Sequence, residues 1–260
     1  MRPLVMGVLN VTPDSFSDGG EHFAADSAIA HGLKLWGEGA DIVDVGGEST
    51  RPGSERPSSD EELRRVLPVI RALAQEGVVL SVDTQRSEVA CAAVEAGAKY
   101  INDVSGGLTD PQMLSAAAEL GVTYIAQHWR GSEGKMSTEA KYDDVVAEVR
   151  GELQARADAC LAAGIAPEKV ILDPGLGFAK NAEHNWELLR RLDELPSYPL
   201  LIGASRKRFL AGLAGEDTRK ARDAATVAVS VLTAGKTWGV RTHQVREQRA
   251  ALEVWEKLRG

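Results

Sequence analysis

The residues best suited to chemistry are polar side chains at the ends of short apolar runs. Asp83, Asn102 and Asp173 each lie at or near the end of such a run. A carboxylate can accept two parallel N–H bonds from an amidine-like edge, which guanine, pterin and arginine all present. The Asn amide adds a donor and an acceptor. This combination predicts a pocket for a flat, nitrogen-rich heterocycle.

A second group of candidates is cationic. Lys207 follows the seventh apolar run, and Arg241 and His243 lie in the eighth. The chain has a net charge of −8, so a local basic cluster indicates a small anion rather than broad affinity for nucleic acid or membranes. Asn10 ends the first run and offers an amide oxygen, a hard ligand suited to Mg2+ beside phosphate oxygens and water. We expect one substrate with a heterocycle at one end and a phosphate or pyrophosphate at the other.

Alternating strands and helices are needed to position these side chains. Eight apolar runs predict strands, and eight Ala-, Leu-, Glu- and Arg-rich periodic segments predict helices. The strands are expected at residues 4–10, 41–46, 78–84, 100–104, 123–128, 170–173, 200–205 and 238–243. The helices are expected at residues 26–38, 60–75, 88–96, 111–120, 138–163, 183–195, 221–234 and 245–258.

Glycines mark the expected helix ends just before the following strand. They are Gly39, Gly77, Gly97, Gly121 and Gly164. A glycine in this place is typical of the residue after a helix C-terminus. Eight β-then-α units predict an α/β fold, a (β/α)8 barrel with residues 1–260 in one domain. The alternative, a doubly wound sheet, would more commonly have five to seven strands.

Period-two alternation refines the expected site. It places Asp83 on the same strand face as Ser81, and Asp173 on the same face as Ile171. In (β/α)8 barrels the working residues come from the carboxyl ends of the strands. Asp83, Asn102 and Asp173 are therefore expected to converge on one pocket, with Lys207 beside them. His128 follows the fifth strand, and the sequence leaves open whether it is functional or a buried structural residue.

The cysteines and the apolar runs favour a cytosolic protein. Cys91 and Cys160 lie in Ala-rich helical stretches with no CxxC spacing, which indicates reduced core thiols in a cytosolic protein. The first apolar run is short and ends in polar residues, so no signal peptide is expected. No run approaches the length of a membrane span. We expect a cytoplasmic location.

Six motifs, in order over nearly the whole chain, resemble the dihydropteroate synthase family of folate biosynthesis. They are residues 7–20, 47–53, 81–84, 101–105, 173–180 with 205–207, and Arg241-Thr242-His243. The resemblance implies a (β/α)8 barrel and a transferase that uses Mg2+. The implied reaction joins (7,8-dihydropterin-6-yl)methyl diphosphate to 4-aminobenzoate, giving 7,8-dihydropteroate and pyrophosphate. A homodimer is also implied only by this resemblance.

The same resemblance implies roles for individual residues. Asn10 would be the metal ligand. The pterin would be held by Asp83, Asn102, Asp173 and Lys207, the diphosphate by Thr50, Arg241 and His243, and the 4-aminobenzoate by Phe16, Asp18, Arg51, Pro52 and Phe178. The implied mechanism resembles an SN1 displacement, in which Asp18, Asp83 and Lys207 are the catalytic candidates. Departing pyrophosphate would leave a pterin-stabilised cation for the arylamine to attack.

Three positions depart from the commonest family pattern. Gln127 stands where Met often covers the pterin, Arg208 where Ser is frequent, and Gln244 where Asp is usual. Gln127 and Gln244 support the first of two alternative functions, and a shared pterin pocket is the reason to consider the second. One is a pterin-binding paralogue with weak or no catalysis, and the other is a methyltetrahydrofolate methyltransferase. The basic motifs argue against the methyltransferase, because a methyl donor needs no pyrophosphate site.

Overall fold

The computed structural model describes residues 1–12, 20–48, 56–130, 140–213, 215 and 217–259. Eight strands in these residues form one parallel sheet in the order β6-β5-β4-β3-β2-β1-β8-β7. A parallel bridge from Leu172 to Leu200 joins the two ends of the sheet. The strands are β1 (Leu4–Asn10), β2 (Ile42–Gly46), β3 (Leu80–Asp83), β4 (Tyr100–Asp103), β5 (Thr123–Gln127), β6 (Val170–Asp173), β7 (Leu201–Ile202) and β8 (Gly239–Thr242).

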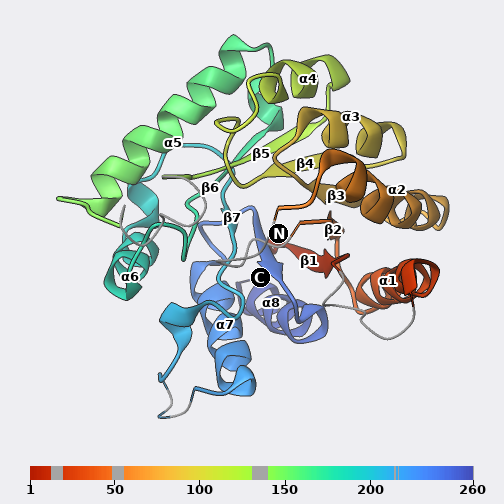
Figure 1. Ribbon diagram of the computed structural model, residues 1–260. Coiled ribbons are helices and arrows are strands. Elements are labelled where there is room, and N and C mark those ends of the chain that lie inside the picture. Colours follow the sequence, from red (N-terminus) through yellow and green to blue (C-terminus); the bar gives the residue numbers. More distant parts are fainter. Residues whose placement is uncertain (13–19, 49–55, 131–139, 214, 216, 260) are drawn as a thin grey trace.

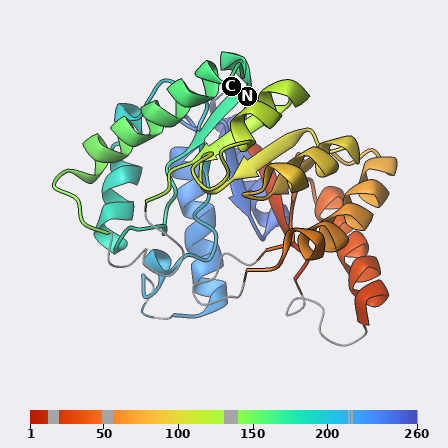
Figure 2. The ribbon, with the colours of Figure 1, turned by 45° about the horizontal axis from the view of Figure 1, so that its top comes forward.

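Eight α-helices of the described chain alternate with these strands and surround them (Figures 1 and 2). The predicted single-domain (β/α)8 barrel is confirmed. The helices are α1 (Gly20–Gly37), α2 (Ser59–Gln75), α3 (Ser87–Glu95), α4 (Met113–Leu120), α5 (Val145–Ala162), α6 (Ala182–Arg190), α7 (Arg219–Thr233) and α8 (Val245–Arg259).

Two apolar clusters hold the barrel together. Outward-facing strand residues such as Val43 and Val82 pack with helix residues such as Leu73 in the larger cluster. The smaller cluster fills the amino-terminal end of the barrel interior with Met6, Ile42, Ile125, Ile171 and Leu201. Burying one such side chain contributes about 1.5–3 kcal/mol, so the lower barrel is a rigid base for the strand ends above it.

The five predicted helix-end glycines all have positive φ, between +62° and +122°. Gly121 shows their effect most directly, since it ends α4 in the left-handed conformation and its N–H donates to Ala117 and Ala118. Glycine adopts this conformation without the steric cost that a Cβ would bring. This part of the sequence prediction is confirmed.

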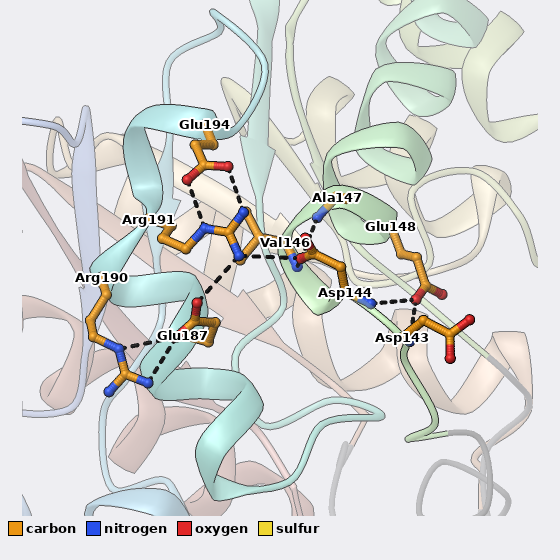
Figure 3. A network of polar contacts seen from close by, with 9 residues as sticks. All are labelled: Asp143, Asp144, Val146, Ala147, Glu148, Glu187, Arg190, Arg191 and Glu194. Atoms are coloured by element: carbon orange, nitrogen blue, oxygen red, sulfur yellow. Dashed lines mark hydrogen bonds and ion pairs between the residues drawn. The ribbon is translucent and has the colours of Figure 1, made fainter.

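Helix α5 begins later than predicted. The sequence predicted a helix from residue 138, but residues 140–144 are not helical and the first helical residue is Val145. The Asp144 carboxylate accepts hydrogen bonds from the N–H groups of Val146 (3.0 Å) and Ala147 (3.1 Å), which fixes the helix start there (Figure 3). An Asp at the N-cap satisfies N–H groups that have no partner inside the helix.

The same network explains why α6 is shorter than predicted. The expected helix to residue 195 ends at Arg190 and is followed by a 3-10 turn, Leu192–Glu194. Arg191 leaves helical geometry with φ −114° and contacts Asp144, Glu187 and Glu194 (Figure 3). Its guanidinium thereby connects the start of α5 to the end of α6. Strand β7 is also shorter than predicted, with only two paired residues.

No helix in the described ranges is both long and apolar enough to cross a bilayer. Cys91 and Cys160 are both free thiols, and Cys160 is buried. Cys91 is half-buried, so only Cys160 has the core position expected for both.

Candidate active site

The inward-facing positions change from apolar to polar along the strands. Ile42, Ile125 and Ile171 belong to the apolar base of the barrel. Two residues further on, the same strands present Asp44, Gln127 and Asp173, all of them buried. Because side chains on a strand alternate with period two, these polar groups lie directly above the apolar base. The carboxyl end of the barrel is thus lined by polar side chains.

An ion-pair network occupies one side of this polar layer. Arg241 donates from Nε to Asp44 Oδ2 (2.6 Å) and from Nη2 to Asp83 Oδ2 (2.5 Å). Asn102 donates from Nδ2 to the same Asp44 oxygen (3.0 Å). Four strands, β2, β3, β4 and β8, contribute one residue each. The structure therefore brings together Asp83, Asn102 and Arg241, three of the residues expected from the sequence.

Burial and charge act in opposite directions on this network. Burial raises the pKa of Asp83 to about 7, although Arg241 opposes the shift. Arg241 is half-buried, and Asp44 and Asp83 hold its pKa above the ordinary value although burial opposes the shift. An opposite charge at hydrogen-bond distance favours the ionised form of each partner. Arg241 is thus a charged group between two carboxylates, and its Nη1 takes part in neither ion pair.

Asp44 was missed in the sequence analysis. Its side chain is fully buried, and its Oδ1 has no hydrogen-bond partner among the described residues. The available signal was a single Asp at an inward position of an otherwise apolar strand, between Ile42 and Gly46. A buried carboxylate in such a strand needs a charged or donating partner. The sequence pattern did not identify the hydrogen-bond partners of Asp44, which are Asn102 and Arg241.

Asp173 and Lys207 form the other side of the layer. Asp173 Oδ1 accepts the N–H of Gly175 (2.7 Å). A Cβ at Gly203 would lie 3.6 Å from Asp173 Oδ2 and 3.9 Å from Lys207 Nζ, so both groups approach each other over this glycine. Burial raises the pKa of Asp173, and Lys207 opposes the shift. Burial lowers the pKa of Lys207 to about 8, with Asp173 opposing.

Phe178 covers this pair from the loop between β6 and α6. The Lys207 ammonium lies 4.7 Å from the centroid of its ring, and the ring of Trp129 lies 6.2 Å away, tilted by 44°. Lys207 also donates to the carbonyl of Leu176 in the same loop. The structure thus places Phe178 against Lys207, which lies beside Asp173.

Two further candidates lie at the ends of β1 and β8. Asn10 is partly exposed at the end of β1 and is in register with Gly46. His243 follows β8, and its Nδ1 lies 2.9 Å from Ser205 Oγ, which follows β7. A hydroxyl beside the ring fixes the orientation of the imidazole. Arg206, next to Lys207, is turned away to Asp223 on α7 (2.9 Å).

Several sequence-predicted site residues lie outside the described residues, so their roles remain predictions. They are Phe16, Asp18, Thr50, Arg51 and Pro52. Of the unusual positions, Gln127 is buried in the barrel interior and its Nε2 donates to Val104 O at 3.4 Å. This long hydrogen bond holds the polar Gln127 side chain at a position where the family that the chain resembles more often has Met.

Comparison with known proteins places this geometry in a family. Residues 6–245 match the family described as pterin binding enzymes. A dihydropteroate synthase of Mycobacterium leprae is 51% identical over 96% of this chain and 91% of its own length. The Escherichia coli K12 dihydropteroate synthase is 44% identical over 98% and 91%, respectively.

Solved structures show the same similarity. Xanthomonas albilineans dihydropteroate synthase with 4-aminobenzoic acid has a TM-score of 0.92 and 46% identity, covering 100% of this chain and 94% of that one. The same enzyme in complex with 7,8-dihydropteroate has a TM-score of 0.89 and 43% identity, with the same coverage. With barrel, polar strand ends and sequence in agreement, the chain belongs to the dihydropteroate synthase family of pterin-binding enzymes.

Proposed function

We propose that this protein joins (7,8-dihydropterin-6-yl)methyl diphosphate to 4-aminobenzoate, releasing pyrophosphate and forming 7,8-dihydropteroate. The observation that carries the proposal is the buried polar layer at the carboxyl end of the barrel. It combines carboxylates and an amide, suited to the pterin edge, with the cations Lys207 and Arg241. Relatives solved with 4-aminobenzoic acid and with 7,8-dihydropteroate support one of these substrates and the product.

Asp173, Asn102 and Asp83 are the proposed pterin contacts. Asp173 keeps one oxygen on Gly175 N–H, so Oδ2 is the acceptor that remains for the amino-pyrimidine edge. Asn102 uses its Nδ2 on Asp44, which directs Oδ1 away from that carboxylate and makes it available to a ligand donor. Lys207 beside Asp173 would donate to a ring nitrogen or carbonyl.

The diphosphate would meet Arg241 and His243, together with Thr50. Arg241 is paired with Asp44 and Asp83 in the structure, so an incoming anion must either bind through Nη1 or displace one carboxylate. Displacement of Asp83 would free its carboxylate for the pterin. Binding of one end of the substrate would then prepare the contact to the other end.

The proposed reaction develops charge in two places. The C–O bond to pyrophosphate breaks first, which leaves positive charge on the pterin methylene and negative charge on the leaving group. Asp83 and Asp18 would stabilise the cation, while Arg241 and His243 would stabilise the pyrophosphate. The 4-aminobenzoate nitrogen then forms the new C–N bond and loses a proton.

The residues present fit a Mg2+ ion that is held mostly by its substrate. Asn10 is a partly exposed amide at the end of β1. The described residues contain no group of three or more His, Cys, Asp or Glu side chains that could form a protein cage for a metal. Mg2+ commonly uses one or two protein oxygens together with water and phosphate oxygens. When bound, it would neutralise charge on the diphosphate.

The test of the proposed function is product formation. Purified protein with Mg2+ and both substrates should release pyrophosphate and form dihydropteroate, and excess chelator should lower the rate at least about tenfold, since a metal contributes several kcal/mol of charge stabilisation. Tight pterin diphosphate binding without product would instead identify a pterin-binding paralogue. No binding of either substrate would contradict the proposal altogether.

We also propose that the protein is a cytoplasmic homodimer. The location is supported by the two free cysteines. Dimerisation is supported by large apolar side chains exposed on the adjacent helices α7 and α8: Leu232 is 82% exposed, Val254 59% and Leu258 82%. Exposed apolar side chains grouped on neighbouring helices are typical of interfaces.

Replacing Leu232 by Arg should therefore shift the protein toward monomer, because a buried interface would have to accommodate an unpaired charge. The measurement is molar mass by light scattering after size exclusion. Leu108→Arg is the matched control, since Leu108 is 51% exposed just before α4, on another part of the barrel. A monomeric wild type, or an unchanged mass for Leu232→Arg, would exclude an interface at this position.

A further inference from the structure

Lys180 is an ionisable residue near the site to which the proposed reaction assigns no role. It ends the loop that joins β6 to α6 and carries Phe178. Its ammonium folds back under this loop and donates to Gly175 O (3.1 Å), Phe178 O (3.0 Å) and His128 Nδ1 (2.8 Å). An ammonium has three N–H donors, and here each has an acceptor.

The backbone of this loop is one that needs such support. Gly175 and Gly177 have φ of +64° and +78°, and Ala179 has φ of +46° although it carries a Cβ. A non-glycine residue in this region is strained by roughly 1–3 kcal/mol and persists only where its surroundings impose it. The two carbonyls bound by Lys180 lie on either side of Leu176 and Gly177. The Lys180 ammonium therefore stabilises the turn by binding the carbonyls at both of its ends.

The third bond of Lys180 continues into a chain of charges. Because an ammonium can only donate, His128 Nδ1 must accept, and the ring proton lies on Nε2, which donates to Glu152 (2.8 Å). Burial, together with Lys180, lowers the pKa of His128 to about 4. Burial acts to raise the pKa of Glu152, but hydrogen bonds from His128 and Arg130 bring it down to about 2. With Lys180 protonated, a neutral histidine thus connects a cation on the loop to an anion on α5.

Lys207 contacts the same loop from the side of the site. It donates to Leu176 O and lies against the Phe178 ring, while a Cβ at Gly177 would lie only 2.9 Å from its Cδ. The loop is therefore held between two lysines, of which only Lys207 is a proposed substrate contact. Burial and the charge of Lys207 lower the pKa of Lys180 to about 7, as expected for two cations beside one loop.

We infer that Lys180, acting through the loop and with His128 and Glu152 behind it, is a positioning residue that places Phe178 for the second substrate. This inference rests on the proposed function. Asp83 and Asn102 are held by pairing between β3 and β4. Asp173 is held by pairing between β5 and β6, although its Oδ1 also accepts the N–H of Gly175 in the loop. The pterin contacts therefore depend on Lys180 less than Phe178 does. Loss of Lys180 should weaken 4-aminobenzoate recognition more than pterin recognition.

The test is Lys180→Met, which keeps an unbranched side chain one atom shorter and removes the three N–H donors. The KM for 4-aminobenzoate should rise at least about tenfold, the factor that corresponds to 1.4 kcal/mol, while the Kd for the pterin diphosphate changes less than about threefold. Amide hydrogen exchange of residues 175–181 should become faster. Lys169→Met is the matched control. Lys169 also donates to a backbone carbonyl, that of Gly121, but it lies just before the start of β6, at the opposite end of the strand from the loop.

A second pair of variants keeps the inference testable if Lys180→Met does not fold. In His128→Asn an amide oxygen can still accept from Lys180, whereas His128→Leu leaves that N–H without a partner. The KM for 4-aminobenzoate should rise more for Leu than for Asn. The inference would be overturned if His128→Asn and His128→Leu raised the KM for 4-aminobenzoate equally. It would also be overturned if Lys180→Met weakened recognition of both substrates equally, or left the KM for 4-aminobenzoate within about twofold of the wild type.

Failure of the proposed function gives a different result. If the wild-type protein makes no product, the proposed reaction is wrong, but amide hydrogen exchange of residues 175–181 still tests the role of Lys180. Unchanged exchange in both Lys180→Met and His128→Leu would show that the loop does not depend on this chain of contacts. In that case the inference fails whether or not the protein is active.

Discussion

Replacing Asp173 by Asn should lower the affinity for the pterin diphosphate at least about tenfold. The Gly175 N–H, 2.7 Å from Asp173 Oδ1, will keep the amide oxygen of Asn at that place. The NH2 group then takes the position of Oδ2, where it faces Lys207 and the N–H donors of the pterin. Charge-assisted bonds contribute roughly 1.5–3 kcal/mol each, and 1.4 kcal/mol corresponds to tenfold.

Calorimetric titration with pterin diphosphate and Mg2+ measures this effect. Asp193→Asn is the matched control, because Asp193 is an exposed residue paired with Lys236 and lies outside the polar layer. Its affinity should equal that of the wild type. If Asp173→Asn binds as tightly as the wild type, Asp173 does not contact the pterin.

Replacing Gly175 by Ala should be the most destabilising of the glycine substitutions near the site. A Cβ there would lie 2.5 Å from the carbonyl oxygen of His128, a backbone atom that cannot turn aside, and the residue has φ of +64°. A left-handed non-glycine residue costs about 1–2 kcal/mol, and overpacking adds about 1–3 kcal/mol. We expect the free energy of unfolding to fall by about 3 kcal/mol, and turnover to fall because the Phe178 loop moves.

Substitutions of two other glycines separate the conformational cost from the steric cost in this prediction. Gly77 has φ of +76° with no atom within 4 Å of its added Cβ, so Gly77→Ala should show the conformational cost alone. Gly37 also has an open surrounding and lies in α1, where Ala should be neutral or slightly stabilising. Urea midpoints at constant m-value compare the three variants. Equal losses for Gly175→Ala and Gly77→Ala would mean that the loop yields without cost.

The sequence alone determined the fold and the place of the site. Eight apolar runs alternating with periodic helical segments specify a (β/α)8 barrel, because hydrophobic periodicity follows directly from which face of an element is buried. Polar residues at the run ends, such as Asp83 and Asp173, locate the site at the carboxyl end of the strands. The glycines at the helix ends were also predictable, because the left-handed conformation that ends a helix depends on a single residue.

Helix boundaries were less predictable where side chains distant in sequence decide them. The segment before Val145 has helical composition, but Asp144 caps α5 and is held by Arg191, 47 residues later. The composition of the segment does not reveal that Asp144 will be taken up as a cap. Strand β7 has two residues, and the contact that closes the barrel beside it is a single bridge from Leu172 to Leu200.

The partners inside the site were decided only by the tertiary structure. Asp44 lies 58 residues from Asn102 and 197 from Arg241, yet the closed barrel brings all three into one hydrogen-bonded network. Likewise, Lys180 reaches His128 across 52 residues. Sequence periodicity states which face of a strand a side chain occupies. The hydrogen-bond partner of that side chain is determined only by the register between strands and the path of the loops. These depend on the contacts that close the barrel and not on neighbours along the chain.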